Sequence, residues 1–338
     1  MSGVRPAEAP VENDGILLFD LDPQWGLGAR IAQHLKMPVS LHEERGFEDG
    51  ELKVRPLVGV RNRDVYVVQS LQGDAERSVH DKLCRLLFFV GAVKDASAAS
   101  VTVVTPYLAY ARKDRRTKPR DPVTLRYLAG MMEAVGVDRV VAVDVHNEAA
   151  FENAFRCRTE HLEARKLFAA HLAPLAGQGG LSVVSPDVGG VKRAERLRES
   201  LEHALGRDVG LAFMEKTRSG GVVRGGTLVG DVQGRTVAIL DDLISTGTTM
   251  MRAASACRAA GGGPVFALAT HGLFVGGAPT VVASPLFDHV VVTDTLPPFR
   301  LPEKLVSRRV TVLPTAPLLA EAITRIHRGG SVSDLLAD

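Results

Sequence analysis

The sequence predicts an α/β fold in which mainly parallel sheets are flanked by helices. Short apolar runs alternate with amphipathic segments along the chain, which is the pattern of parallel strands joined by crossover helices. Two of the apolar runs, 140–146 and 237–242, follow a helical pattern and carry acidic residues at their carboxyl ends. This repetition predicts two similar α/β domains in tandem.

Each element is predicted from its hydrophobic period. The predicted strands are 15–19, 65–69, 100–105, 140–145, 181–185, 209–213, 236–240, 265–270 and 289–293. The predicted helices include 25–35, 81–95, 123–135, 163–172, 191–204, 248–260 and 317–328. The glycine-rich segment 177–180 precedes a strand, so we expect a turn there and not a phosphate-binding loop.

The order of these elements predicts the domain organisation. Residues 1–14 are polar and contain proline, and we expect them to form a disordered tail. An N-terminal domain is expected at 15–163 and a C-terminal domain at 164–305. A closing strand and helix at 306–338 are expected to pack on the N-terminal domain.

Composition excludes several classes of protein. With 338 residues, 45% hydrophobic and 24% charged, the chain is long enough for two domains with their own cores, and its mean hydropathy of +0.06 is that of a soluble protein. A net charge of +2 gives no global argument for nucleic acid, and no apolar run reaches membrane-spanning length. The three cysteines lack metal-ligand spacing. We therefore expect a cytoplasmic protein with reduced thiols and no nucleic-acid or membrane partner.

The most informative stretch is 236–249, where an apolar strand leads to two acids, a loop of hydroxyls and a glycine, and then a helical pattern. A helix N-terminus presents backbone N–H groups and a positive dipole end to a phosphate. Thr246, Thr248 and Thr249 can add hydroxyl donors, while Asp241 and Asp242 lie where open α/β sheets bind ligands. The stretch is therefore suited to a sugar phosphate; the alternative is a solvated turn with an ordinary N-cap.

Two segments of the first half carry candidate binding residues. Phe47 lies between acids in 46–51, which indicates either an exposed hairpin turn or a site that stacks on a purine ring. Arg112, Lys113 and Arg115 follow the predicted strand 100–105. They are either a solvated charge cluster or a site that holds a polyphosphate by bidentate hydrogen bonds.

Three further segments carry groups for catalysis or metal binding. His146 ends a predicted strand and is a candidate structural residue, metal ligand or general base. Asp187 follows the strand 181–185 and could share a divalent metal with His146. The cationic segment 214–221 leaves a strand and is typical of a mobile lid or of an ordinary surface loop.

Taken together, these motifs resemble those of the ribose-phosphate pyrophosphokinase family, also called 5-phosphoribosyl-1-pyrophosphate (PRPP) synthetases. The similarity is carried, in collinear order, by FEDGE, PYLAYARKDR, VDVH, SPDVGGVKRA, EKTR, LDDLISTGTT and ATHGLF, and it extends from about residue 15 to the carboxyl end. The LDDLISTGTT segment also resembles the PRPP-binding motif of type I phosphoribosyltransferases. The resemblance implies two tandem phosphoribosyltransferase type I-like domains.

The family resemblance also implies a reaction and its site residues. MgATP would transfer its β,γ-diphosphoryl group to the C1 hydroxyl of ribose 5-phosphate, giving PRPP and AMP. The N-terminal domain would be the ATP side and the C-terminal domain the ribose 5-phosphate side. Subunits would form dimers, built into hexamers, so that a neighbouring subunit completes the ATP site.

By motif, the implied ATP-binding residues are Phe47, Asp49, Glu51, Arg112, Lys113 and Arg115. The implied ribose 5-phosphate site consists of Asp187, Asp241, Asp242, Ser245, Thr246, Gly247, Thr248 and Thr249. His146 and Asp187 would position Mg²⁺, and Lys216, Arg218 and His146 would be the catalytic residues.

The chain departs from the family pattern at several positions. Ser245 stands where the family usually has Asp, and Thr248 where it has a second Gly, so Thr248 is expected to take over a glycine's backbone angles. Lys113 replaces a Gln, Thr217 replaces a basic residue, and 147–151 also differs. An active, divergent enzyme is the favoured interpretation. The alternatives are a catalytically weak regulatory subunit and a phosphoribosyltransferase that consumes PRPP.

Overall fold

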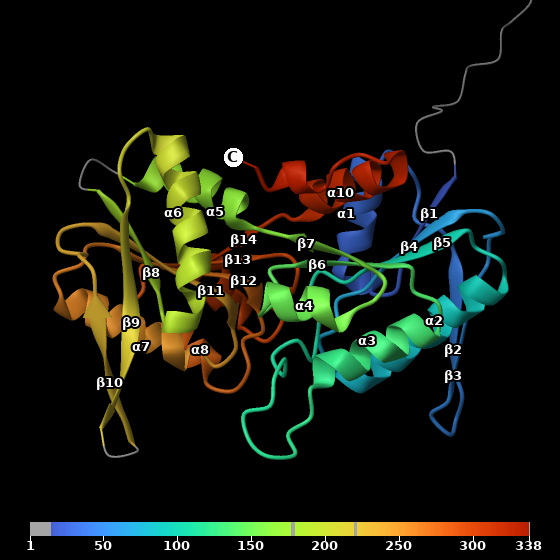
Figure 1. The fold of residues 1–338 in the computed structure, drawn as a ribbon, viewed down its shortest axis with the longest axis horizontal. Coiled ribbons are helices and arrows are strands. Elements are labelled where there is room, and N and C mark those ends of the chain that lie inside the picture. Colours follow the sequence, from blue (N-terminus) through green and yellow to red (C-terminus); the bar gives the residue numbers. More distant parts are fainter. Residues whose placement is uncertain (1–14, 177–179, 220–221, 338) are drawn as a thin grey trace, which may run out of the picture. The chain divides into compact units, whose positions relative to one another are not determined.

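A computed structural model describes residues 15–176, 180–219 and 222–337, without the side chains of residues 216–225 (Figure 1). The predicted tail 1–14 and residues 177–179 of the predicted turn lie outside this description. Contacts divide the chain into two compact units. The N-terminal unit takes the chain up to Ala142, with Ala149–Glu160 and Ala316–Leu335; the C-terminal unit takes Val143–Glu148, His161–Thr315 and the chain from Leu336.

The N-terminal unit contains most of a five-stranded sheet. Its strand order is β1 (Ile16–Asp20), β4 (Asp64–Val68), β5 (Ser100–Val104), β6 (Arg139–Val143) and β7 (Arg158–Leu162). The pairs from β1 to β6 are parallel, and these strands are almost continuously buried. Such Val-rich strands suit a parallel sheet that is covered on both faces. Its helices are α1 (Leu27–His34), α2 (Val79–Asp95), α3 (Thr124–Ala134), α4 (Glu148–Ala154) and α10 (Ala316–Arg328).

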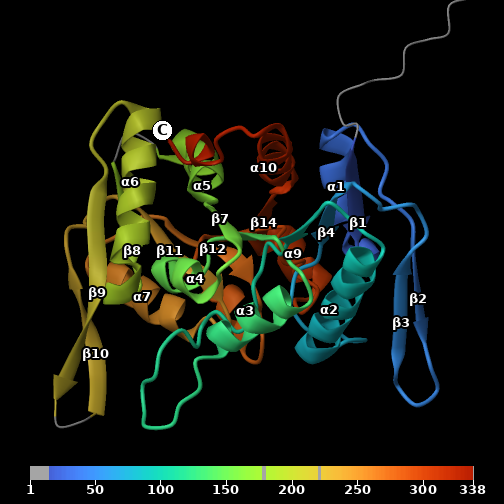
Figure 2. The same cartoon turned by 45° about the vertical axis from the view of Figure 1, so that its right-hand side comes forward.

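Two pieces of the N-terminal unit join segments that are distant in sequence. Helix α10 packs on α1, and the Nδ1 atom of its His327 lies 2.8 Å from an oxygen of Asp64 at the start of β4. Strands β2 (His42–Gly46) and β3 (Leu52–Pro56) form a separate antiparallel hairpin against α2 (Figure 2). The hairpin is therefore held from the side by a helix of the same unit.

The C-terminal unit is built on a seven-stranded sheet. Its order is β10 (Val222–Val229), β9 (Gly210–Ser219), β8 (Leu181–Ser185), β11 (Thr236–Ile244), β12 (Val265–Gly272), β13 (His289–Thr293) and β14 (Val310–Leu313). The pairs from β9 to β14 are parallel, and only β10 joins antiparallel. Its helices are α5 (Arg165–Leu172), α6 (Val191–Leu205), α7 (Thr248–Ala259), α8 (Ala278–Val282) and α9 (Glu303–Arg309). Short 3₁₀ turns lie at Pro23–Trp25 (η2), Ala173–Leu175 (η3), Val188–Gly190 (η4) and Ser333–Leu335 (η5).

Amphipathic helices cover this sheet and build its core. Helix α6 packs on β8 and β9, and α7 packs on β10, β11 and β12. From α7, Met250, Ala253, Ala254 and Cys257 enter a core that includes Val184, Ile239 and Ala267 from the strands. Burial of these apolar side chains fixes the position of the loop that precedes α7.

The structure confirms the predicted α/β class and corrects several elements. Strands β8 and β13 have the predicted bounds. Strand β11 does not end at residue 240: it continues through both acids to Ile244, because β12 pairs with it as far as Gly272. The described part of the segment 214–221 is not an irregular surface loop, since β9 runs to Ser219 and pairs with β10; its role as a lid stays a prediction. No helix in the described ranges is long and apolar enough to cross a membrane.

Candidate active site

The C-terminal sheet changes direction between two adjacent strands. From β8 the chain proceeds to β9 and β10 on one side, whereas from β11 it proceeds through β12 to β14 on the other. In open α/β sheets, ligands bind beyond the carboxyl ends of the strands at such a reversal. Asp187 follows β8, and Asp241 and Asp242 lie in the last part of β11. These three residues of the implied ribose 5-phosphate site thus lie at the reversal.

Asp242 is nearly buried and contacts two basic side chains. Its side chain is only 5% exposed, and its Oδ2 lies 2.9 Å from Nδ1 of His146. Arg193, from α6, places Nη1 3.6 Å from Oδ1 of both Asp241 and Asp242. The Asp242 backbone N–H donates to Oδ1 of Asp241 at 2.9 Å. One guanidinium and one imidazole therefore face two adjacent carboxylates.

The pKa values of the two carboxyl groups are shifted in opposite directions. Burial, and then the charge of Asp242, raise the pKa of Asp241 well above its ordinary value. Burial also acts to raise the pKa of Asp242, but the hydrogen bond from His146 and the charge of Arg193 outweigh it, so the pKa of Asp242 is lowered. A carboxyl whose pKa is raised is one whose charge lacks compensation. The site therefore favours a cation or a hydroxyl donor beside Asp241.

The loop after β11 has the geometry of an anion-binding helix start. Helix α7 begins at Thr248, and Gly247 before it has a left-handed φ of 79°. A Cβ atom on Gly247 would meet Cγ1 of Val281 at 2.6 Å, so both the backbone and the space require glycine. Thr246 and Thr248 are exposed, and their hydroxyls lie 3.0 Å apart. Hydroxyls and helical N–H groups thus gather at one helix N-terminus.

Thr248 adopts ordinary helical backbone. It is the first residue of a regular helix and is not among the described non-glycine residues with positive φ. The left-handed residue of the loop is Gly247. A threonine at position 248 is therefore accommodated without left-handed backbone, and the expectation that it takes over a glycine's angles stays a prediction.

Asp187 is built into the turn between β8 and α6. Its Oδ1 accepts a hydrogen bond from the Gly190 N–H at 3.2 Å, which caps η4. The Ser185 hydroxyl donates to the Asp187 carbonyl at 2.6 Å. The turn is tight, because a Cβ on Gly190 would lie 2.7 Å from Oγ of Ser185. The shared metal site of Asp187 and His146 stays a prediction.

The implied catalytic cations lie on β9. Lys216 and Arg218 are both in this strand, where Lys216 pairs with Gly226 and Arg218 with Val223 of β10. Their side chains, like that of Thr217, lie outside the described residues. Their predicted role in catalysis therefore stays a prediction.

In the N-terminal unit, the implied ATP-binding residues lie on two projecting segments. Phe47, Asp49 and Glu51 are exposed at the tip of the β2–β3 hairpin, where Phe47 is 44% exposed. The Arg45 guanidinium lies 5.2 Å from the Phe47 ring centroid. The Glu51 N–H donates to Oδ1 of Asp49 at 3.1 Å. The tip thus presents an aromatic ring beside acidic groups.

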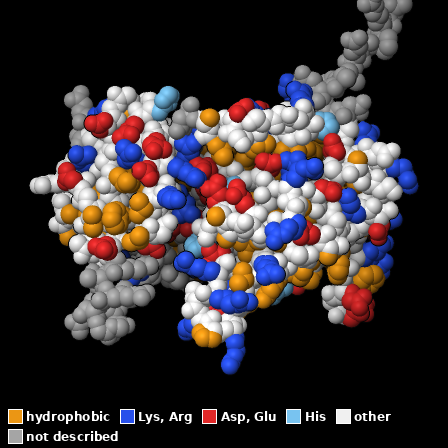
Figure 3. All heavy atoms as spheres, viewed as in Figure 1, with side chains coloured by type: hydrophobic (Ala, Val, Ile, Leu, Met, Phe, Trp, Pro, Cys, Tyr) orange, Lys and Arg blue, Asp and Glu red, His pale blue; other side chains and the backbone are white. Residues whose placement is uncertain are grey.

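The second segment is the loop between β5 and α3, a projecting lobe rich in basic side chains in Figure 3. Arg112 and Arg115 are exposed on it. Lys113 instead contacts its own loop, with Nζ 2.5 Å from an Asp121 oxygen and 3.1 Å from the Thr117 hydroxyl. The hydrogen bond from Lys113, followed by those from Thr117, holds the pKa of Asp121 well below its usual range. Lys113 therefore has a structural role in the loop beside its implied role in ATP binding.

Arg193, Asp144 and His271 are residues near the site to which sequence reasoning gave no role. Arg193 stands in SPDVGGVKRA and His271 in ATHGLF, two motifs that were recognised only for their order. A basic residue in the first turn of the helix after Asp187 is a signal that could have suggested a counter-ion for the acid pair. Asp144 and His271 contact segments more than 100 residues away in sequence, which no local pattern reveals.

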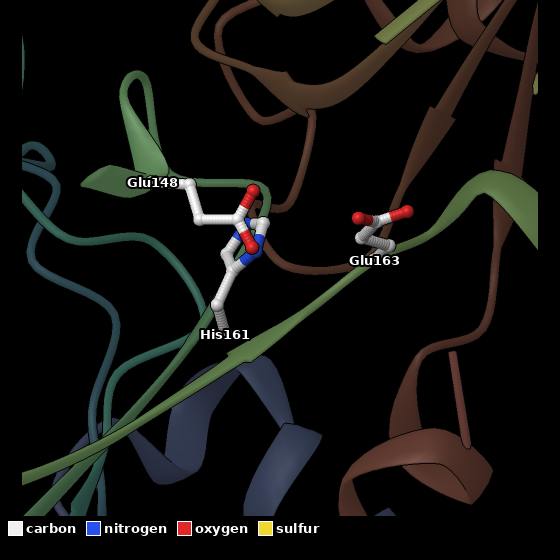
Figure 4. A group of neighbouring side chains, drawn as sticks. All are labelled: Glu148, His161 and Glu163. Atoms are coloured by element: carbon white, nitrogen blue, oxygen red, sulfur yellow. The ribbon is translucent and has the colours of Figure 1, made fainter. Parts of the chain in front are cut away.

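Glu148, His161 and Glu163 form the one group in the described ranges with three possible metal-ligating atoms within 4.8 Å of one another (Figure 4). The Arg196 guanidinium, however, lies 3.1 Å from an oxygen of Glu148 and also pairs with Glu163. Hydrogen bonding from His161 lowers the pKa of Glu148 to about 2, burial opposes that shift, and Arg196 adds to it. An internal cation thus compensates these acids, which favours a structural ion-pair network.

Family models match the chain almost from end to end. The N-terminal domain of ribose phosphate pyrophosphokinase matches residues 16–136, a phosphoribosyl transferase domain matches 159–268, and a phosphoribosyl synthetase-associated domain matches 223–337. A putative ribose-phosphate pyrophosphokinase 2 of Streptococcus pyogenes is 35% identical over 324 residues, which are 95% of this chain and 94% of that protein. The chain belongs to the ribose-phosphate pyrophosphokinase family.

Other members of the family support the same assignment over the whole fold. Ribose-phosphate pyrophosphokinase of Caldanaerobacter subterraneus is 37% identical over 310 residues, 91% of this chain and 94% of that protein. The crystal structure of phosphoribosylpyrophosphate synthetase from Mycobacterium smegmatis has a TM-score of 0.82 and 33% identity, and the match covers 94% of this chain and 100% of that one. The predicted tandem phosphoribosyltransferase-type fold is thereby confirmed.

Proposed function

We propose that the protein is a ribose-phosphate diphosphokinase, which transfers the β,γ-diphosphoryl group of MgATP to the C1 hydroxyl of ribose 5-phosphate and releases PRPP and AMP. The observation that carries the proposal is the arrangement on β11, where two acids with opposite pKa shifts directly precede a hydroxyl-rich loop and a helix N-terminus. The acids suit the ribose hydroxyls and the loop suits the 5-phosphate. Family membership supplies the reaction to which this acceptor site belongs.

We assign the following roles to the residues of the site. Asp241 and Asp242 accept hydrogen bonds from the ribose hydroxyls, and Asp187 lies across the reversal from them. Ser245, Thr246, Gly247, Thr248 and Thr249 bind the 5-phosphate with hydroxyls and backbone N–H groups. Phe47, Asp49 and Glu51 bind adenine, while Arg112, Lys113 and Arg115 bind the ATP phosphates. Lys216 and Arg218 contact the transferring group, where cations stabilise the charge that develops on its oxygens.

Mg²⁺ is the cofactor that we propose, with His146 and Asp187 as the residues that would hold it. The donor chemistry fits, because carboxylates near His146 offer the hard oxygen atoms that Mg²⁺ prefers. His146 donates its Nδ1 proton to the Asp242 carboxylate, so a neutral imidazole carries its lone pair on Nε2. A metal-binding histidine usually shows this orientation. When bound, Mg²⁺ would neutralise phosphate charge, and Asp242 would orient the imidazole.

We further propose a cytoplasmic homo-oligomer based on dimers, in which the β2–β3 hairpin of one subunit completes the ATP site of its neighbour. The exposed ring of Phe47 supports this proposal, because an aromatic side chain that is 44% exposed at a hairpin tip is available to a ligand or a second subunit. Dimers could assemble further into hexamers.

The test is an assay of AMP release from ATP by the purified protein. We expect release to require both added ribose 5-phosphate and Mg²⁺. A protein that releases no AMP alone, but does so or stimulates release when mixed with an active relative, would instead be the regulatory subunit. Consumption of PRPP together with a purine base, without ATP, would identify a phosphoribosyltransferase and overturn the proposal.

A further inference from the structure

Every residue of the segment 143–146 is anchored to another part of the C-terminal unit. His271 contacts the Val143 carbonyl at 2.9 Å, and the Asp144 N–H donates to the Leu162 carbonyl at 2.8 Å. The Val145 N–H donates to Nε2 of His161 at 3.3 Å. His146 then meets Asp242. A segment fixed at each residue has few alternative conformations, so its final side chain is presented in one orientation.

Asp144 adopts a backbone conformation that needs such support. Its φ is +41°, in the left-handed region that non-glycine residues seldom occupy, and its side chain is buried. One carboxylate oxygen accepts hydrogen bonds from the Ala164 N–H, at 2.9 Å, and from the Thr270 hydroxyl. A residue in a sparsely populated backbone conformation persists only where its surroundings compensate for it. The compensation here comes partly from Thr270 on β12.

His271, the next residue of β12, is buried and bonded through both ring nitrogens. Because a carbonyl can only accept, Nε2–H donates to Val143, and Nδ1 lies 2.9 Å from the Thr295 hydroxyl. Burial lowers the pKa of His271, which favours a neutral ring with its proton on Nε2 and with Nδ1 facing the Thr295 hydroxyl. The register of β11 and β12 pairs Asp241 with Ala269 and Leu243 with His271. The strand that supports segment 143–146 is therefore the neighbour of the strand that carries the acid pair.

We propose that His271 is a positioning residue: with Thr270, it fixes segment 143–146 on β12 so that the His146 imidazole meets Asp242 at the acceptor site. This inference rests on the proposed function, because it assigns His271 a part in that reaction. Its effect is indirect, since His271 acts through the Val143 carbonyl and not on the substrate. Misplacement of a reactive group by about 1 Å can cost on the order of 10²-fold in rate.

The test compares three variants at His271 with a matched control. His271→Leu removes the donor, His271→Asn retains an amide near the Thr295 side, and His271→Gln can extend an N–H donor toward Val143. The control is His289→Leu, because Nε2 of His289 contacts the Thr311 hydroxyl at 2.7 Å in the same sheet without touching segment 143–146. Thr270→Val is a second route, since it removes only the hydroxyl that donates to Asp144.

We expect His271→Leu to lower kcat for AMP release by about tenfold or more, with less than about a threefold change in KM for ribose 5-phosphate. KM for ribose 5-phosphate should change little, because the loop 245–249, which we propose binds the 5-phosphate, does not depend on His271 for its contacts. His271→Gln should recover most of the rate, whereas His271→Asn should not. If His271→Leu and His289→Leu lose equal activity, or if His271→Gln is no better than His271→Leu, the positioning role is wrong. Should His271→Leu not fold, Thr270→Val must show the same split between kcat and KM.

A second readout does not depend on turnover. In protein labelled with ¹⁵N-histidine, the Nδ1 signal of His146, assigned with His146→Asn, reports its hydrogen bond to Asp242. We expect this signal to move in His271→Leu and in Thr270→Val, and to stay in place in His289→Leu. An unmoved signal in both variants overturns the inference even if the wild type releases AMP. If the signal moves in both variants but the wild-type protein releases no AMP, only the proposed function is overturned.

Discussion

In the N-terminal unit three carboxylates meet three cations, whereas in the C-terminal unit two carboxylates share one guanidinium and one imidazole, and the imidazole contacts only Asp242. Asp22, Glu44 and Asp74 contact Arg77, Lys82 and Arg85 at 2.8 to 3.1 Å. Arg193 approaches Asp241 and Asp242 only to 3.6 Å. A buried charge that is fully paired holds structure, while one that is incompletely paired retains affinity for a ligand. The difference separates scaffold from site.

The two sheets also differ in the order of their strands. In the N-terminal unit, β1, β4, β5 and β6 follow one another across the sheet in chain order. In the C-terminal unit the order reverses between β8 and β11, so two loops leave that point in opposite directions. The acid pair lies on β11 at this reversal. In the N-terminal unit the balanced cluster instead ties the β2–β3 hairpin, through Glu44, to α2.

The largest effect is expected from Lys82→Met in the balanced cluster. The Lys82 side chain is 0% exposed and contacts Asp22 at 3.1 Å and Asp74 at 2.8 Å. Removing one member of a buried ion-pair network leaves uncompensated charge and should lower the free energy of unfolding by about 3–5 kcal/mol. Trp25, the single tryptophan, lies in η2 next to Asp22, so its fluorescence in urea reports this unit.

The matched control for Lys82→Met is Lys94→Met. Lys94 contacts Asp138 at 2.9 Å, but the two side chains are 29% and 38% exposed. An exposed pair contributes about 0–1 kcal/mol. Equal losses in the two variants would show that the N-terminal cluster is no more structural than a surface pair.

Asp241→Asn should have the opposite pattern: a loss of activity without a loss of stability. The substitution removes the negative charge and replaces one of the two carboxylate acceptor oxygens of the proposed ribose site by an NH2 donor, so AMP release should fall by about 10²-fold. Because burial, and then the charge of Asp242, raise the pKa of Asp241, ionisation of this carboxyl costs more in the folded than in the unfolded state, and a neutral amide removes that cost. Thermal unfolding of the variant should therefore occur at an unchanged or higher temperature. A clear decrease in unfolding temperature would mean that Asp241 is part of the scaffold.

Acid should unfold the N-terminal unit by protonating the carboxylates of its ion pairs. Burial acts to raise the pKa values of Glu44 and Asp74, but the net shift of both is downward. His42 and Arg85 lower the pKa of Glu44, and Lys82 lowers the pKa of Asp74. A carboxyl whose pKa is lowered in the folded state stabilises the fold at pH values above its pKa in the unfolded chain. This contribution is lost as the pH falls through the lowered pKa. In Lys82→Met the Asp74 pKa should rise, so the Trp25 transition should occur at a higher pH than in the wild type. Coincident acid transitions would contradict this.

The sequence predicted those features of the two units that depend on residues close together in the chain. Alternating apolar runs predicted the α/β class and the bounds of β8 and β13, and the order of motifs predicted the family. It did not predict that β11 continues through the acids, because that extension depends on its pairing with β12. The short strand β7 was also missed, since its pattern is brief and its pairing partner supplies the information.

Within the site, the motifs predicted which residues carry the chemistry but not what holds them. Arg193 and His271 lay inside recognised motifs, yet their partners are distant in sequence. At Thr248 the backbone is helical, and the left-handed residue is Gly247, one position earlier. The replacement of a family glycine by threonine did not reveal this arrangement, because it depends on where the helix begins.

The smallest effect is expected from Thr248→Gly, which restores the glycine that the family usually has. Thr248 opens α7 with helical backbone, so a glycine there relieves no strain and should lower stability by about 0.5 kcal/mol. KM for ribose 5-phosphate should change less than about threefold, because the helical N–H groups remain. Gly247→Ala is the contrasting variant: its φ of 79° and the close Val281 side chain should cost at least about 1–2 kcal/mol and weaken binding of ribose 5-phosphate. If Thr248→Gly raised activity severalfold, the threonine would be a real impairment, and the incomplete pairing of the acids would not suffice to make this site active.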